Sequence, residues 1–112
     1  METYLITGGA GFVGLHLAEY LLEKGHSVHC VDSLLTGSPE SIGHLLSQPR
    51  FKFVEGRLED QDVLATAARG CCGIFHVAAM GSTAELNSAV IRFAAEHSMP
   101  VMVTSSPAIP FA

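Results

Sequence analysis

The feature that most constrains the fold is a glycine-rich segment, residues 7–14 (TGGAGFVG), which separates a strand-like run from a helix-like pattern. Residues 4–7 (Tyr-Leu-Ile-Thr) form a short apolar run that predicts a buried strand. Beyond the glycines, Val13, Leu17 and Leu21 recur at helical spacing, and Gly25 ends the predicted helix. A strand that enters a helix through a glycine turn indicates the first half of a β-α-β unit, which belongs to a parallel sheet.

The same alternation continues along the chain. Further strands are predicted at residues 27–31, 51–54, 73–77 and 101–104. Helices are predicted after Ser38 with Ile42, Leu45 and Leu46 as its apolar stripe, from Asp60 or Glu59 to Gly70, and over residues 84–97. Since such crossovers are right-handed, this pattern predicts an α/β fold: a Rossmann-type doubly wound parallel sheet of about five strands, in the order 3-2-1-4-5.

Composition fits one small globular domain over residues 1–112. Hydrophobic residues make up 48% of the chain and charged residues only 15%, which excludes a disordered polyelectrolyte. The six basic residues are scattered in a chain of net charge −5, so we expect no nucleic-acid partner. No apolar run approaches the roughly 20 residues of a membrane span. The first residues, Met1-Glu2-Thr3, lack the basic start of a signal peptide, so we expect a cytoplasmic protein.

Neither the cysteines nor the histidines are spaced like metal ligands. The three cysteines, Cys30, Cys71 and Cys72, are an odd number, which favours reduced thiols rather than a disulfide framework. The vicinal Cys71 and Cys72 have no further ligands at a suitable spacing, and the six histidines show no paired spacing. We therefore predict no metal site.

The glycines have distinct roles if the segment holds a dinucleotide. Gly8 permits the tight turn, Gly11 lets a pyrophosphate approach the backbone, and Gly14 lets the helix pack closely on the sheet. The N–H groups of the first helical turn, near Phe12 and Val13, point at the phosphates, and the helix dipole favours their negative charge.

Asp32 ends the second predicted strand, where a carboxylate can accept hydrogen bonds from the adenine ribose. The same carboxylate repels a 2′-phosphate, and residues 33–37 contain no Lys or Arg to bind one. The sequence therefore predicts NAD rather than NADP as the cofactor.

The order of motifs resembles the N-terminal part of the extended short-chain dehydrogenase/reductase family, of the NAD-dependent epimerase/dehydratase type. The residues that carry this resemblance are the glycine segment, Val31-Asp32, Val54-Glu55-Gly56, residues 75–79 (FHVAA) and residues 103–106 (VTSS). The resemblance implies that Gly8, Gly11, Phe12, Val13 and Gly14 hold the pyrophosphate and that Asp32 holds the ribose. It also implies that Ala78 and Ala79 line the pocket near the middle of the cofactor. Ser106 matches the family's active-site hydroxyl, which polarises the substrate oxygen, and the partner in a full-length relative is a nucleotide sugar.

The chain departs from this family at three places, one of which is the segment between Ala79 and the helix predicted over residues 84–97, where the family has a longer segment on the substrate side. Arg57 follows Gly56 where the family has an acid that contacts adenine, so Arg57 and the following Leu58 are assigned to the adenine end of the site. Arg57 either stacks on the base or pairs with Glu59 or Asp60. The family's catalytic Tyr-x-x-x-Lys is absent before the last residue, Ala112, and the pair with that spacing, Tyr20 and Lys24, is expected on a solvated helix surface.

The sequence thus predicts an incomplete NAD-binding domain of a nucleotide-sugar epimerase or dehydratase, without its substrate-binding part and not catalytically competent as an isolated chain. Two alternatives stay open: a fragment resembling 3-beta-hydroxysteroid dehydrogenases, favoured by residues 105–111, and a non-catalytic dinucleotide-binding module. Residues 101–103 are expected to form an open apolar sheet edge with Met102 exposed, so we expect self-association through this edge or marginal stability.

Overall fold

Five short apolar segments form one parallel sheet in the predicted order. The computed structural model describes residues 2–8, 12–32, 43–77 and 84–104. Its strands are β1 (Thr3–Thr7), β2 (Ser27–Asp32), β3 (Phe51–Glu55), β4 (Gly73–Val77) and β5 (Val101–Thr104). They lie side by side in the order β3-β2-β1-β4-β5, and every neighbouring pair is parallel. The predicted α/β fold, its strand order and its strand positions are confirmed.

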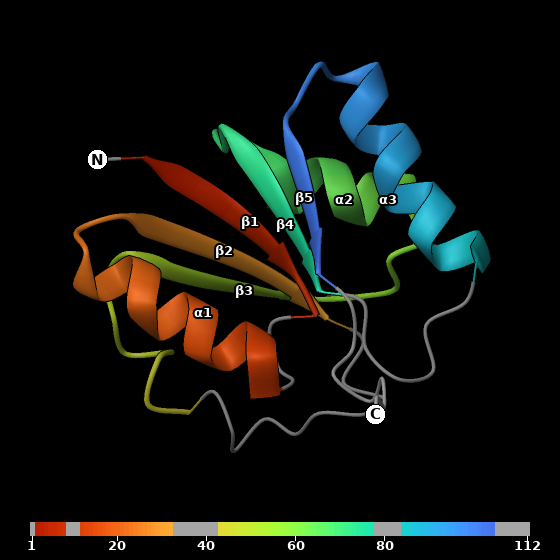
Figure 1. Ribbon diagram of the computed structural model, residues 1–112. Helices are drawn as coiled ribbons and strands as arrows, with labels where there is room; N and C mark the ends of the chain where they lie inside the picture. Colours follow the sequence, from red (N-terminus) through yellow and green to blue (C-terminus); the bar gives the residue numbers. More distant parts are fainter. Residues whose placement is uncertain (1, 9–11, 33–42, 78–83, 105–112) are drawn as a thin grey trace, which may run out of the picture.

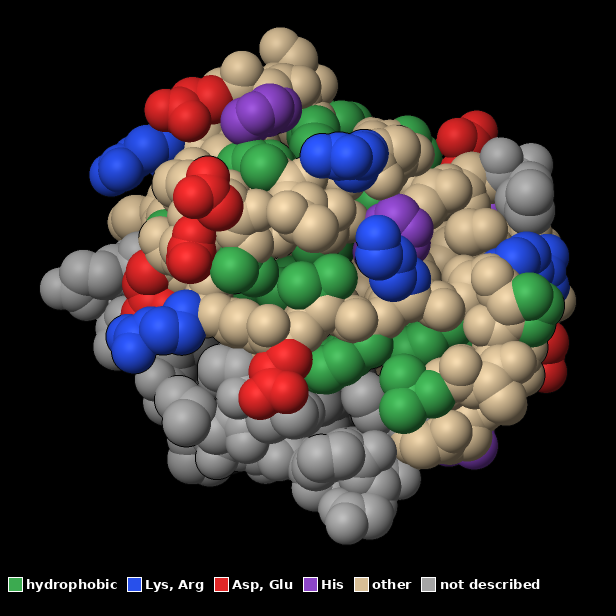
Figure 2. Space-filling model, turned by 180° about the vertical axis from the view of Figure 1, so that it is seen from behind, with side chains coloured by type: hydrophobic (Ala, Val, Ile, Leu, Met, Phe, Trp, Pro, Cys, Tyr) green, Lys and Arg blue, Asp and Glu red, His purple; other side chains and the backbone are tan. Residues whose placement is uncertain are grey.

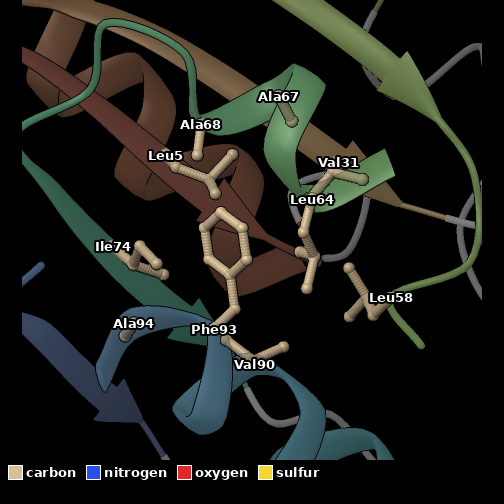
Figure 3. Packing of buried hydrophobic residues seen from close by; sticks show 10 residues of the cluster. All are labelled: Leu5, Val31, Leu58, Leu64, Ala67, Ala68, Ile74, Val90, Phe93 and Ala94. Atoms are coloured by element: carbon tan, nitrogen blue, oxygen red, sulfur yellow. The ribbon is translucent and has the colours of Figure 1, made fainter. Parts of the chain in front are cut away.

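Helices cover both faces of this sheet (Figure 1). The helix α1 (Phe12–Glu23) lies on one face, whereas α2 (Gln61–Ala68) and α3 (Ala84–Glu96) lie on the other. Successive strand side chains point to opposite faces, so Leu5 packs under α2 and α3 while its neighbour Ile6 packs under α1. Figure 3 shows the cluster of buried side chains between the sheet and the helices α2 and α3. Phe93 of α3 lies at its centre, with its ring directed at the sheet.

The topology brings the carboxyl ends of all five strands to one edge of the sheet. The chain runs outward from β1 to β2 and β3, and then crosses back to place β4 against the other side of β1. The carboxyl ends of all the strands therefore meet at one edge, where the arrowheads lie in Figure 1. At this edge the boundary between β1 and β4 is the topological switch point, where the strand order reverses and open α/β sheets bind ligands.

The helix predicted after Ser38 is wrong in the part that can be compared. Residues 38–42 lie outside the described residues, and residues 43–47 form turns. Backbone and side-chain bonds spanning three residues hold them, from Gln48 N to Leu45 O and from Ser47 Oγ to His44 O. Leu45 is buried under α1, but Leu46 is exposed. Serine bonding to the local backbone competes with helix formation, and Pro49 prevents its continuation.

Within the described part of the chain, β5 pairs with β4 alone, and Met102 and Val103 are both exposed. No helix among these residues is long and apolar enough to cross a membrane. On the face seen in Figure 2, the Lys and Arg side chains are spread out rather than gathered into one patch.

Candidate cofactor-binding site

Gly8 occupies a position that only glycine can fill. Its φ of +83° lies in the left-handed region, which L side chains rarely adopt. Its N–H donates a hydrogen bond to Val31 O at 2.9 Å. A Cβ atom built on Gly8 would lie 3.0 Å from Val77 O, a backbone atom that cannot rotate away. Gly8 thus lies between the ends of β2 and β4, and its backbone is held close to both strands.

The helix that follows this turn begins at Phe12, as the sequence predicts, and the third glycine, Gly14, is buried within its first turn. Its first turn contains no acidic residue. The first N–H groups of a helix have no partner within the helix, and together with the dipole they favour an anion. Gly11 lies outside the described residues, and for Phe12 and Val13 the structure describes the backbone alone. The geometry at Gly8 and the composition of this turn suit a pyrophosphate.

Asp32 ends β2 at the same edge and is largely buried. Because side chains alternate along a strand, Asp32 lies on the α1 face together with Cys30. Burial raises the pKa of the Cys30 thiol well above its ordinary value, and the nearby Asp32 charge raises it further, so Cys30 stays a neutral thiol. A buried carboxylate beside the glycine turn is a suitable acceptor for two vicinal hydroxyl groups, such as those of a ribose.

The end of β3 completes this row of strand ends. Gly56 N donates a hydrogen bond to Asp32 O at 3.0 Å, which fixes the start of the next loop beside Asp32. Of the alternatives left open for Arg57, the structure contains the ion pair with Glu59, with Nη2 and Oε2 separated by 3.5 Å. Arg57 is exposed, whereas Leu58 is buried in the core under α2 and α3, so the Leu58 side chain points away from solvent.

The remaining predicted site residues follow strand ends that converge on the same edge. Ala78 and Ala79 come directly after β4, and Ser106 comes two residues after β5, but all three lie outside the described residues. Tyr20 and Lys24 lie on the exposed surface of α1 and its end, as expected, with Lys24 Nζ 5.5 Å from the Tyr20 ring centroid. Over the part of the chain that the structure covers, no group of three or more metal-binding side chains occurs.

The sequence analysis missed one polar pair at this edge. Thr7 and His76 are fully buried at the ends of β1 and β4, and Thr7 Oγ1 lies 2.5 Å from His76 Nδ1. Both residues lie in segments already singled out for other reasons. A polar residue at or next to the last position of each of the two strands was the available signal, but only the strand order could pair them.

Comparison with known proteins shows which family the chain matches and which proteins it is similar to. The NAD dependent epimerase/dehydratase family matches residues 4–103. UDP-glucuronic acid decarboxylase 1 of Arabidopsis thaliana is 37% identical over 78 residues, which are 70% of this chain and 17% of that protein. A 3 beta-hydroxysteroid dehydrogenase/Delta 5-->4-isomerase of Mycobacterium tuberculosis is 40% identical over 76 residues, which are 68% of this chain and 19% of that protein.

Solved structures give the same fold. The dTDP-glucose 4,6-dehydratase of Bacillus anthracis in complex with NAD superposes with a TM-score of 0.82 at 18% identity, covering 94% of this chain and 37% of that one. The Bordetella bronchiseptica enzyme WbmH in complex with NAD+ reaches a TM-score of 0.75 at 29% identity, covering 88% and 36%. The chain therefore spans little more than a third of these structures and less than a fifth of the two curated relatives.

Proposed function

Because the chain belongs to the NAD-dependent epimerase/dehydratase family, we propose that it binds NAD and supplies the cofactor-binding part of an enzyme that acts on a nucleotide sugar. The observation that carries this proposal is the glycine turn at the switch point. At Gly8 a positive φ coincides with a close approach to Val77 O, so that only glycine fits without strain at the strand-to-helix turn where this fold binds a pyrophosphate. Bound NAD would supply a hydride acceptor and donor.

The residue roles follow the order of the strand ends. We assign the pyrophosphate to the turn and first helical residues, namely Gly8, Gly11, Phe12, Val13 and Gly14. Beside them Asp32 accepts hydrogen bonds from the adenine ribose. Arg57 and the backbone of Leu58, at the end of the adjacent β3, lie where the base extends. On the other side of β1, Ala78 and Ala79 line the pocket near the middle of the cofactor, and Ser106 provides the hydroxyl that polarises the substrate oxygen.

Asp32 also sets the choice between the two nicotinamide cofactors. Its carboxylate would repel the 2′-phosphate of NADP, and the following residues 33–37 contain no cation to offset this repulsion. The ion pair with Glu59 keeps Arg57 engaged on the β3 side. These charges support NAD.

The alternative of a 3-beta-hydroxysteroid dehydrogenase-like fragment is not favoured. One such enzyme is among the relatives, but the matching family and the similar UDP-glucuronic acid decarboxylases support the nucleotide-sugar class. Residues 105–111, which favoured the steroid class in the sequence, lie outside the described residues. A non-catalytic dinucleotide-binding module shares the same NAD site and is separated from an enzyme by activity alone.

Calorimetric titration of the chain with NAD and with NADP tests the proposal. We expect tighter binding of NAD, and we expect Asp32→Ala to weaken it by about 1–3 kcal/mol, because hydrogen bonds to a charged group are lost. Asp62→Ala, which removes an exposed carboxylate from the first turn of α2, is the matched control and should leave NAD binding unchanged. Equal affinity for the two cofactors in the unaltered chain would refute the assignment to NAD.

Self-association is a separate proposal about the edge of the sheet. The exposed Met102 and Val103 lie on β5, whose outer side has no strand partner among the described residues. An apolar open edge is a template for pairing with another strand, here that of a second copy. Light scattering over a range of concentrations should show a rising mean mass, and Met102→Lys should abolish that rise. A constant monomeric mass would contradict this proposal.

A further inference from the structure

Thr7 and His76 form a fully buried polar contact between the sheet and the helices α2 and α3. The alternation along β1 and β4 places both side chains on the face covered by α2 and α3, in line with Leu5 and Ile74. They are register partners on the two strands, and both are 0% exposed. Thr7 Oγ1 and His76 Nδ1 are 2.5 Å apart, and which atom donates depends on the tautomer of the ring.

Stability alone does not require such a pair. A buried polar group that loses its partner is costly, whereas replacing both partners with apolar groups of similar shape is nearly neutral. The core around Leu5 and Ile74 could therefore accept two apolar side chains at these positions. The polar pair adds a defined geometry. A hydrogen bond holds its two atoms at a set distance and angle, whereas apolar contact does not.

The position of the pair explains why a fixed hydrogen-bond geometry matters there. Thr7 and His76 are the last register pair between β1 and β4. Immediately beyond it the chain leaves β1 toward α1, which covers one face of the sheet, and leaves β4 toward α3, which covers the other. Gly8 follows Thr7 directly, and it faces the backbone oxygen of Val77, which follows His76. The side-chain bond therefore lies at the last paired position of the two strands, directly before the Gly8 turn.

We propose that the Thr7–His76 hydrogen bond fixes the spacing between the carboxyl ends of β1 and β4, and that both are positioning residues for the dinucleotide. They act through Gly8 and Val77 rather than by touching the cofactor. The pair keeps the Gly8 turn against β4 and keeps its N–H on Val31 O. This inference rests on the proposed NAD site, since it explains how the two strands that border that site are held.

Substitutions that separate geometry from stability test this role. Thr7→Val keeps the shape of the side chain but removes the hydroxyl, and we expect it to weaken NAD binding by about tenfold or more, as for a site whose supporting contact is lost. Thr7→Ser restores the hydroxyl and should bind NAD within about twofold of the unaltered chain. Thr3→Val makes the same change at the other end of β1 and should leave NAD affinity unchanged.

The double variant Thr7→Val with His76→Leu is the decisive arm. Neither position then carries a buried polar group that has lost its partner in the pair, so we expect the urea midpoint to rise above that of Thr7→Val while NAD binding stays weak. A purely structural role predicts that affinity recovers along with the urea midpoint, which would overturn the inference.

Nitrogen NMR of the His76 ring and hydrogen exchange at Gly8 give a readout without ligand. Thr7→Val should shift the Nδ1 resonance and speed exchange of the Gly8 N–H, whereas Thr7→Ser should restore both. Unchanged exchange at Gly8 in Thr7→Val would refute the proposed coupling. If the unaltered chain binds no NAD, the proposed function fails and this inference fails with it. If NAD binds equally to the unaltered chain and to Thr7→Val, only this inference fails.

Discussion

The helices α1 and α2 begin at the same edge of the sheet but satisfy their first N–H groups differently. Asp60 caps α2, and its Oδ1 accepts hydrogen bonds from Asp62 N at 2.9 Å and Val63 N at 3.3 Å. Asp62 adds a second carboxylate to that first turn. The first turn of α1 has no acid, and the residue before it in sequence is Gly11, which has no side chain to act as a cap. One helix start is supplied with its own anion, and the other suits an anion from outside.

The largest effect in this comparison is expected at the turn that leads into α1. Gly8→Ala would force a Cβ to within 3.0 Å of Val77 O at a φ of +83°. We expect the chain to lose about 2–3 kcal/mol of stability, from the left-handed strain together with the clash, and to lose measurable NAD binding. Urea unfolding and calorimetric titration measure the two quantities.

Gly25→Ala is the control for this substitution. Gly25 also has a positive φ, of +94°, but a Cβ there would meet nothing within 4 Å. The control should lose only about 1–2 kcal/mol from left-handed strain, with NAD affinity unchanged. Equal NAD affinity in the two variants would show that the approach of Gly8 to β4 does not matter for the site.

The next effect comes from giving α1 the kind of cap that α2 has. Gly11→Asp places a carboxylate directly before α1 in the sequence, as Asp60 stands directly before α2. It should weaken NAD binding by about 100-fold, because the carboxylate repels the pyrophosphate and competes with it for the first N–H groups of α1. Gly11→Asn has the same size and capping ability without the charge. If Gly11→Asn binds NAD at least tenfold more tightly than Gly11→Asp, the negative charge causes the loss of affinity. Identical affinities of the two variants would exclude a charge effect.

The complementary experiment removes the side-chain cap of α2, Asp60, instead of adding a cap to α1. Asp60→Ala leaves Asp62 N and Val63 N without their acceptor and should cost about 1 kcal/mol of stability. NAD affinity should not change, because α2 begins with its own acid rather than with a ligand. Asp60→Asn retains a capping oxygen and should recover most of the lost stability. A loss of NAD binding in Asp60→Ala would contradict the separation of roles between the two helix starts.

These two helix starts were both predictable from sequence, because the signals are local. The glycine spacing identified the turn at Gly8, and an acid before the apolar run at Val63 identified the cap, which the structure assigns to Asp60 rather than Glu59. Asp32 was placed by its position at the end of a strand. Each conclusion needed only residues within a few positions of one another.

What the sequence did not reveal depends on contacts between distant segments. Thr7 and His76 are 69 residues apart and meet only because β4 returns to the side of β1. The turns at residues 43–47 replaced a predicted helix, with Leu45 buried under α1 and Leu46 exposed. The same holds for Arg50, which donates to Leu22 O at 3.2 Å and Gly25 O at 3.0 Å near the end of α1.

The carboxyl ends of the same two helices differ in how their contacts respond to pH. The end of α1 is held by the guanidinium group of Arg50, which donates to Leu22 O and Gly25 O. At the end of α2, Ala67 O lies 2.8 Å from His29 Nδ1 and accepts a hydrogen bond from the thiol of Cys71 at 3.6 Å. Burial, followed by the nearby Cys72, raises the pKa of the Cys71 thiol from 9.0 to about 11, against a lowering effect of Lys52.

This difference gives the smallest predicted effect, at alkaline pH. The folded chain keeps the Cys71 proton up to pH 11, whereas the unfolded chain releases it near pH 9, so the stability due to this thiol is complete below pH 9 and is lost as the pH rises toward 11. Cys71→Ser still donates to Ala67 O but does not titrate in this range, so its urea midpoint should fall less steeply over that interval than that of the unaltered chain. Cys72→Ser, which changes the exposed neighbour, should keep most of the slope. If Cys71→Ser and the unaltered chain lose stability in parallel, Cys71 does not carry the alkaline response, and the two helix ends do not differ in this way.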